Sequence, residues 1–242
     1  MQLKIITLNV WRYYEWETRK QKLLNFLRKE NADIIFFQEV ASSEKSKWEN
    51  QIDEINEKLK YPYSSYSNMA HMTKWHEKPI NYLMFYGLGF ISKYRIKKSE
   101  FVKLKPVLKN KDFGFLHLVI ETSKGDIDLI DVHFENTDKG AKKQLKETIK
   151  WIKQKNISPI IAGDFNMKNI NDLIKILGKD YEISCLIKPY FSFMPTEFSN
   201  NKEPITLDYI VVKKNKFKIE EIKCIEDSPS DHKPIIAEIK TL

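Results

Sequence analysis

The sequence predicts an α/β protein in which two mixed β-sheets pack face to face and helices cover their outer faces. Short apolar runs alternate with segments whose apolar residues recur at helical spacing. Two of the strand-like runs flank a tight-turn segment at 122–125, which predicts an antiparallel hairpin beside the strand–helix–strand units. Mixed parallel and antiparallel strands with interspersed helices indicate two packed sheets.

The N-terminal elements form a strand–helix–strand unit. Residues 3–10 are expected as a strand, 19–30 as a helix with one apolar stripe, and 33–37 as a continuous apolar strand. A surface helix is expected at 42–59, because an apolar stripe lies on one side of this segment and charged residues fill the other side.

The rest of the chain continues the alternation without a linker or an internal repeat. The expected strands are 83–91, 102–104, 113–121, 126–134, 159–162, 206–212, 218–222 and 234–239, and the expected helices are 142–155 and 171–177.

Composition limits the class of protein and of partner. The 242 residues, 42% of them hydrophobic, can bury a sizeable core. The net charge of +8 favours polyanionic partners, but lysine-rich sequences also arise in AT-rich genomes or at high growth temperature, so charge carries little weight. No apolar stretch approaches the ~20 residues of a membrane span, and no signal sequence is recognisable, so we expect a cytoplasmic protein. Cys185 and Cys224 show neither disulfide nor metal-site spacing.

Short polar motifs stand where apolar runs end. They are Thr-Leu-Asn at 7–9, Gln-Glu at 38–39, Asp-Val-His at 131–133, Gly-Asp-Phe-Asn at 163–166, Leu-Asp-Tyr at 207–209 and Ser-Asp-His at 230–232. Groups that bind a metal or a phosphate must sit where a buried strand emerges. Six such ends in one chain suggest one assembled site.

Asn9 and Glu39 end the two strands of the first unit. A short crossover makes these strands near neighbours, which brings both side chains within reach of one cation. Taken alone, a Glu at a strand end is more often solvated, and an Asn there is more often a turn residue.

Asp164 and Asn166 stand two residues apart after the glycine of the 163–166 motif. In an extended segment both side chains project to the same side, which suits holding a water and a phosphate oxygen together. The alternative is an Asx turn that closes the strand.

The Asp231-His232 pair precedes the last expected strand. Neighbouring side chains of an extended segment point apart, so the partner of His232 is expected from another strand, with Asp208 a candidate. A carboxylate partner would orient the imidazole and stabilise its protonated form. His133 ends another strand and could donate to a phosphate oxygen.

In this order and spacing, the six motifs resemble the endonuclease/exonuclease/phosphatase superfamily. The segment 89–94, Gly-Phe-Ile-Ser-Lys-Tyr, is also similar to a strand of that family, with Lys93 in place of the usual Arg. The resemblance covers nearly the whole chain. It implies a single domain over residues 1–242 and a four-layer α/β/β/α sandwich of two mixed sheets between helices.

The resemblance also implies metal-dependent phosphoester hydrolysis with Mg²⁺ or Mn²⁺. By similarity, Glu39 is the main metal ligand, Asn9 supports it and Asp231 is a further contributor. Lys93, His133 and Asn166 are the expected substrate-binding residues.

The same resemblance assigns the catalytic roles. Asp164 and Asn166 would orient the attacking water and the phosphate. His232, set by Asp208, would act as general base or stabilise charge, and whether Asp164 or His232 takes the proton stays open. His133 would stabilise the charge that develops on the phosphate or assist the leaving oxygen.

The family branch is indicated by the segment 131–136. The abasic-site endonuclease and exonuclease III branch carries a Tyr where this chain has His133. A His there is similar to pancreatic-type deoxyribonucleases, sphingomyelinases, inositol-phosphate phosphatases, deadenylases and tyrosyl-DNA phosphodiesterases. The aromatic segment 61–86 could stack nucleic-acid bases or could cover a sheet.

The expected function is therefore a phosphodiesterase or nuclease that acts on nucleic acid, with no obligate protein partner evident. The first alternative is a hydrolase for a small phosphorylated metabolite or lipid headgroup. The second is a catalytically silent module that binds polyanions.

Overall fold

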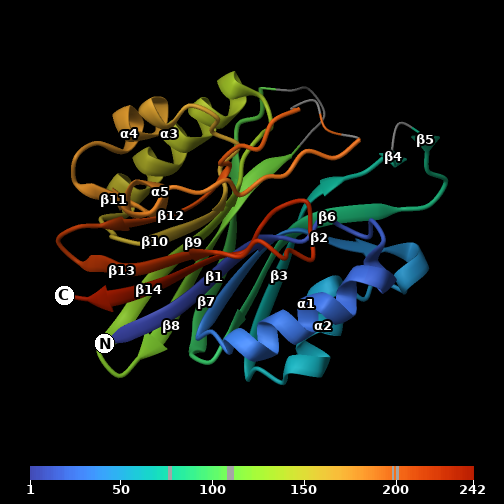
Figure 1. Ribbon diagram of the computed structural model, residues 1–242, viewed down its shortest axis with the longest axis horizontal. Coiled ribbons are helices and arrows are strands. Elements are labelled where there is room, and N and C mark those ends of the chain that lie inside the picture. Colours follow the sequence, from blue (N-terminus) through green and yellow to red (C-terminus); the bar gives the residue numbers. More distant parts are fainter. Residues whose placement is uncertain (76–77, 108–111, 198, 200–201) are drawn as a thin grey trace.

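Two six-stranded sheets form the centre of the computed structural model, which describes residues 1–75, 78–107, 112–197, 199 and 202–242 (Figure 1). The first sheet contains β1 (Gln2–Asn9), β2 (Ile34–Ser43), β3 (Tyr63–His71), β6 (Met84–Ser92), β13 (Phe217–Cys224) and β14 (Ile235–Thr241). Its strand order is β13-β14-β1-β2-β6-β3, in which β1 pairs parallel with β2 and antiparallel with β14.

The second sheet contains β7 (Arg95–Leu104), β8 (Phe113–Thr122), β9 (Gly125–His133), β10 (Ile160–Asp164), β11 (Tyr181–Ile183) and β12 (Asp208–Lys213). Its strand order is β11-β12-β10-β9-β8-β7, in which only the β9–β10 pair is parallel. A separate two-stranded ribbon joins β4 (Lys74–Trp75) to β5 (Lys78–Pro79).

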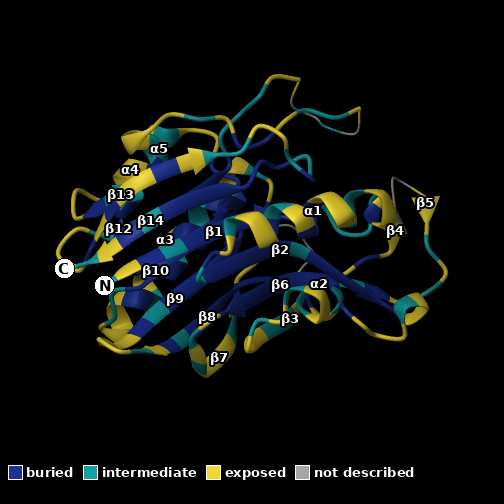
Figure 2. Ribbon diagram, turned by 60° about the horizontal axis from the view of Figure 1, so that its bottom comes forward, coloured by how far each residue is buried: buried dark blue, intermediate teal, exposed yellow. Residues whose placement is uncertain are grey.

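Helices cover the outer face of each sheet (Figure 1). The first sheet carries α1 (Trp16–Glu30) and α2 (Gln51–Leu59), and the second carries α3 (Asp138–Lys155) and α4 (Ile170–Leu177). Two short helices, η1 (Glu44–Ser46) and α5 (Ser184–Ile187), complete the described elements. In Figure 2 the strands are largely buried, while the helices turn exposed faces outward. The four-layer α/β/β/α sandwich is thus confirmed.

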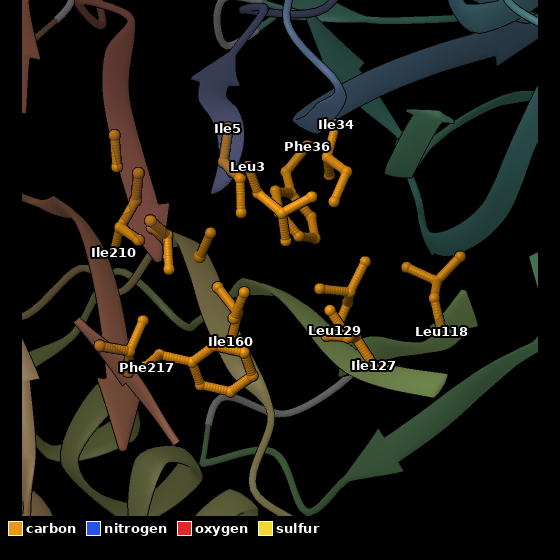
Figure 3. Close-up of a cluster of buried hydrophobic side chains, with 14 of the residues drawn as sticks. Leu3, Ile5, Ile34, Phe36, Leu118, Ile127, Leu129, Ile160, Ile210 and Phe217 are labelled. Atoms are coloured by element: carbon orange, nitrogen blue, oxygen red, sulfur yellow. The ribbon is translucent and has the colours of Figure 1, made fainter. Parts of the chain in front are cut away.

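The space between the sheets is filled by aliphatic and aromatic side chains. In Figure 3, Leu3, Ile5 and Phe36 of the first sheet face Leu129 and Ile160 of the second. All five are fully buried. Since both faces of the central strands are covered, these strands read as continuous apolar runs. None of the described helices is both long and apolar enough to cross a membrane.

The structure differs from the expected elements in several places, among them β7, which begins at Arg95 and not at 102, and the two segments 42–59 and 61–86. The helix expected at 42–59 begins only at Gln51, because Ser42 and Ser43 still pair with β6 and the Asn50 side chain caps α2 by accepting from the amides of Ile52 and Asp53. The segment 61–86 contains β3, an edge strand whose serine-rich sequence lacks the aliphatic pattern of the buried strands.

Candidate active site

The polar strand ends meet in a cleft of about 750 Å³. The residues expected at the site that line it are Asn9, Glu39, His133, Asp164, Asn166, Asp231 and His232. Asp208 lies directly behind His232. Both sheets contribute, since Asn9 and Glu39 belong to the first sheet and His133 and Asp164 to the second.

Glu39 is presented by an irregularity in β2. The pairing of β2 with β6 shifts register between Phe37 and Val40, and Glu39 adopts a left-handed conformation with φ 55°. A bulge of this kind re-aims a side chain at the end of a strand. It places the Glu39 carboxylate in the cleft.

Arg12 is the direct charge partner of Glu39. Its Nε lies 2.7 Å from Glu39 Oε2, and its guanidinium lies over the Tyr86 ring, 5.7 Å from the centroid. Burial alone would raise the pKa of the Glu39 carboxyl, but Arg12 and then His133 outweigh it, and the pKa is lowered. Glu39 is therefore a carboxylate at neutral pH.

His133 and Asp164 are neighbours because β9 and β10 pair in parallel with these two residues in register. His133 Nε2 lies 3.6 Å from Asp164 Oδ2 and 3.8 Å from Glu39 Oε1. Burial lowers the pKa of His133 to about 4, although Glu39 opposes the shift. His133 is therefore a neutral imidazole at pH 7.

Gly163 lets β10 lie close to β9, and Asp164 follows it directly. The φ of Gly163 is +136°, and a Cβ there would lie 2.1 Å from the backbone oxygen of Val132. Asp164 Oδ1 accepts from the amide of Asn166 at 2.9 Å, so the Asx turn considered as an alternative is present. Asp164 Oδ2 accepts from Asn9 Nδ2 of the other sheet at 3.2 Å. The same carboxylate thus closes a turn and faces the cleft.

The side-chain amide of Asn166 is engaged in a hydrogen bond within the protein. The backbone of Asn166 is left-handed, with φ 50°, and its Nδ2 donates to the backbone oxygen of Phe134 at 2.8 Å. The side chain lines the cleft from this fixed position.

His232 takes its carboxylate partner from β12. Its Nδ1 lies 2.8 Å from Asp208 Oδ2, and its Nε2 lies 3.9 Å from Asp164 Oδ2. Burial lowers the pKa of His232, but the charge and hydrogen bond of Asp208 outweigh it, and the pKa is raised well above its ordinary value. The imidazole is therefore held in its charged form.

The pKa values of the Asp164 and Asp231 carboxyls are raised, whereas the pKa of Glu39 is lowered. Burial, with a smaller effect of the Asp208 charge, raises the pKa of Asp164. Burial also raises the pKa of Asp231 to about 6, against the lowering effect of His232. Bound cations lower such values, since a nearby positive charge favours the carboxylate.

Arg19 of α1 fixes the two loops that carry the first-sheet half of the site. Its Nε donates to the oxygen of Tyr14 at 2.6 Å, and its Nη1 to those of Val10 at 3.1 Å and Pro229 at 2.7 Å. Its Nη2 reaches the oxygens of Trp11 and Arg12 at 3.4 and 3.3 Å. One guanidinium thus holds both the turn after Asn9 and the loop before Asp231. In the turn after Asn9, Trp11 and Arg12 both have positive φ.

A buried polar network links the sheets behind the cleft. Gln38 Nε2 donates to Asp131 Oδ1 at 2.6 Å and also lies 3.2 Å from Thr7 Oγ1. All three side chains are fully buried. Burial raises the pKa of Asp131 well above its ordinary value, although the Gln38 hydrogen bond opposes the shift.

Two groups of side chains offer metal ligands. Asp164, Asp208 and His232 can bring one ligand atom each within 4.8 Å of one another. However, His232 Nδ1 is engaged by Asp208, and a protonated imidazole cannot coordinate a metal. The oxygen atoms of Glu39, Asp231 and Asn9 suit Mg²⁺ or Mn²⁺ better, because these hard cations prefer oxygen and need few protein ligands.

Lys93 does not reach the cleft. It follows β6 at the end opposite Glu39, where its Nζ donates to the oxygen of Asn31 at 2.7 Å and lies 3.2 Å from Asp33 Oδ1. The structure therefore does not bring Lys93 to the cleft with the other expected residues, because β6 runs antiparallel to β2 and carries residue 93 away from it.

The aromatic segment 61–86 mostly packs against the fold. Tyr61 donates to the oxygen of Ala32, and Phe85 packs against Trp48. Residues 76 and 77 lie outside the described residues. Within the described part of the segment, the cleft is lined by Met72, Thr73, Lys74 and Tyr86.

Sequence reasoning missed several cleft-lining residues that carry charge or aromatic surface, among them Trp11, Arg12 and Lys168. Arg12 stands three residues after Asn9, so its position at a strand end was the available signal. Its approach to Glu39 depends on the left-handed turn, which no sequence motif indicated.

Comparison with known proteins gives the family. The model of the endonuclease/exonuclease/phosphatase family matches residues 6–232. No curated protein sequence matches the chain.

Solved structures share the fold over almost the whole chain. An endonuclease/exonuclease/phosphatase family protein from Leptotrichia buccalis is 21% identical, with TM-score 0.77 and coverage of 98% of this chain and 99% of that one. D. rerio TDP2 complexed with single strand DNA product is 16% identical, with TM-score 0.69 and 99% coverage of both chains. Sphingomyelinase C from Streptomyces griseocarneus is 15% identical, with TM-score 0.70 and coverage of 98% and 99%. The match over residues 6–232 shows that the chain belongs to the endonuclease/exonuclease/phosphatase family.

Proposed function

We propose that the protein is a divalent-metal-dependent phosphodiesterase that hydrolyses nucleic acid. The observation that carries the proposal is the chain of groups in the cleft, in which Asp208 holds a charged His232 whose Nε2 faces Asp164. The family membership supports phosphoester hydrolysis in general.

Glu39, Asn9 and Asp231 would hold Mg²⁺ or Mn²⁺, which supplies neutralisation of charge on the scissile phosphate when bound. Arg12, Lys74 and Lys168 place basic side chains in the cleft beside these carboxylates. With the charge of the carboxylates offset by a metal ion, the basic side chains would favour an anionic substrate over a neutral one.

We assign the proton-transfer roles from the pKa shifts of Asp164 and His232. Burial raises the pKa of Asp164 to about 8, so its carboxylate form is the strongest base among the cleft carboxylates, and we assign to that form the proton of the attacking water. His232 is already charged, so its Nε2–H stabilises a phosphate oxygen. Neutral His133 lies beside the carboxylates of Glu39 and Asp164, and we assign to it a hydrogen bond to a second phosphate oxygen.

The test is hydrolysis of a substrate panel in Mg²⁺ or Mn²⁺, with EDTA as a control. The panel contains single- and double-stranded DNA, abasic-site duplex, RNA, 5′-tyrosyl DNA, sphingomyelin and inositol phosphates. Cleavage of a nucleic acid supports the proposal and names the substrate. Cleavage confined to a small phosphoester replaces it with the metabolite or lipid-headgroup alternative, and binding without turnover replaces it with the silent module.

Glu39→Gln is the matched test of the metal site. It keeps the shape of the side chain but removes the charge, so we expect metal-dependent turnover to fall by on the order of 10²-fold or more while the far-UV circular dichroism stays unchanged. Glu57→Gln, on the exposed face of α2, should retain full turnover. Activity in Glu39→Gln equal to that of Glu57→Gln would remove Glu39 from the site.

A further inference from the structure

The positive charge of the helical layers is concentrated on one side of the sandwich. Over the first sheet, α1 has five basic and two acidic residues, whereas α2 has one basic and three acidic. Over the second sheet, α3 has seven lysines and two acidic residues, and α4 has one of each charge. A lysine-rich composition alone would not separate the two layers in this way.

Five of the α3 lysines form one stripe. They follow each other at alternating intervals of four and three residues, which places them on one side of a helix. They are Lys139, Lys143, Lys146, Lys150 and Lys153. None of them forms an ion pair with the residues that the structure describes, whereas Lys142, outside the stripe, pairs with Asp138 and Asp172.

The stripe begins beside the active-site cleft. Asn136 lines the cleft and stands three residues before Lys139. From Lys139 to Lys153 the helix rises about 21 Å along the outer face of the second sheet. The first lysine is therefore near the site, and the last lies well away from it.

The distal half of the stripe borders a hollow of about 410 Å³ between α3 and α4. Lys146, Lys150 and Lys153 line it together with Gln154, and Ile149 and Ile176 add apolar surface. No acidic side chain is among these lining residues. Cationic side chains beside an apolar surface complement a single-stranded nucleic acid, which presents phosphates on one side and bases on the other.

From this arrangement we infer that the α3 stripe, Lys139 to Lys153, binds the part of a single-stranded nucleic-acid substrate that extends beyond the cleft. The inference rests on the proposed function and specifies its substrate class. The path from the cleft between the sheets to the outer face of α3 must bend. A duplex resists bending over so short a distance, whereas a single strand is flexible.

The test compares two triple variants by fluorescence anisotropy in EDTA, where metal-dependent cleavage is stopped. Lys146→Gln/Lys150→Gln/Lys153→Gln removes three charges from the stripe. Lys29→Gln/Lys58→Gln/Lys60→Gln removes three exposed charges from the side of α1 and α2. The probes are fluorescein-labelled oligothymidylates, one roughly 6 and one roughly 30 nucleotides long.

We expect the stripe variant to bind the long probe on the order of ten-fold more weakly and to lower the slope of log Kd against log salt by about 2, since each single-strand phosphate contact contributes about 0.7. The short probe should bind both variants like wild type. Equal weakening by both triple variants would show a net-charge effect and overturn the inference, as would an unchanged long-probe affinity in the stripe variant.

Turnover separates this inference from the proposed function. If wild type and stripe variant hydrolyse the long probe equally well in Mg²⁺, the function stands and the stripe inference fails. If wild type hydrolyses no nucleic acid but hydrolyses a small phosphoester, both fail. Stripe-dependent binding to phosphatidylserine vesicles, with oligonucleotide binding unaffected, would assign the stripe to a membrane instead.

Discussion

His232 and Asp208 show how a single contact sets the charge of a side chain in the candidate active site. The 2.8 Å contact between Nδ1 and Oδ2 raises the pKa of the imidazole against the effect of burial. Because the folded pKa lies above the unfolded value of about 6.5, the stabilisation is fully present below that pH and is lost as pH rises through the folded pKa.

We predict that Asp208→Asn lowers the pKa of His232, because it removes the charge that outweighs burial. The titration of the His232 ring followed by NMR in EDTA should shift to lower pH. Asp128→Asn, which removes the carboxylate beside His117, should leave that titration unchanged. An unaltered His232 titration in Asp208→Asn would contradict the assignment of His232 as a charge stabiliser.

Among the site residues, the sequence predicted the groups but not their distances. Asn9, Glu39, His133, Asp164 and His232 could be selected because each ends or follows an apolar run. Arg12 and Lys93 could not be placed correctly. The first depends on a left-handed turn, and the second depends on the strand direction, which sequence does not report.

The β10 strand shows what one glycine does for an element. Gly163 has positive φ and no room for a Cβ beside Val132, and the next residue is Asp164. A side chain at 163 would push β10 from β9 and move Asp164 relative to His133.

Gly163→Ala should therefore lower the free energy of unfolding by on the order of 3 kcal/mol and reduce turnover together. Gly125→Ala provides the control, because Gly125 also has positive φ, +107°, but a Cβ added there would meet no atom within 4 Å. It should cost only about 1 kcal/mol and leave turnover intact. Chemical denaturation and steady-state rates measure both, and similar behaviour of the two variants would refute the close-contact explanation.

Buried elements were more predictable than exposed ones. The strands β1 and β14 were expected within one or two residues, since their apolar runs are uninterrupted. The edge strands β3 and β11 were missed, because one is rich in serine and the other has three residues. Single-domain organisation over residues 1–242 stays a prediction.

At the scale of the whole molecule, the two sheets are joined by polar contacts inside an apolar interface. Asn9 reaches Asp164, and Gln38 reaches Asp131. Asp131 is fully buried, so its raised pKa means that folding favours the protonated carboxyl.

The sign of the resulting pH dependence is opposite to that of an ordinary salt bridge. The folded state holds the Asp131 proton where the unfolded chain has lost it, so stability falls as pH rises from about 4 through the folded pKa. Asp131→Asn removes this titration, and its free energy of unfolding should decline less with pH than that of wild type. Asp126→Asn, on the same strand but paired at the surface with Lys97, should keep the wild-type slope. Urea denaturation across a pH series decides between the two.

The division of the site between the sheets also determines when it exists during synthesis. Asn9 is near the start of the chain and His232 near its end, yet Ser230, beside His232, donates to the backbone oxygen of Asn9 at 2.7 Å. A ribosome must therefore release the segment 230–232 before the first and last motifs can meet. If the centre hydrolyses nucleic acid as proposed, the nascent chain is harmless to the RNA around it until that segment has emerged.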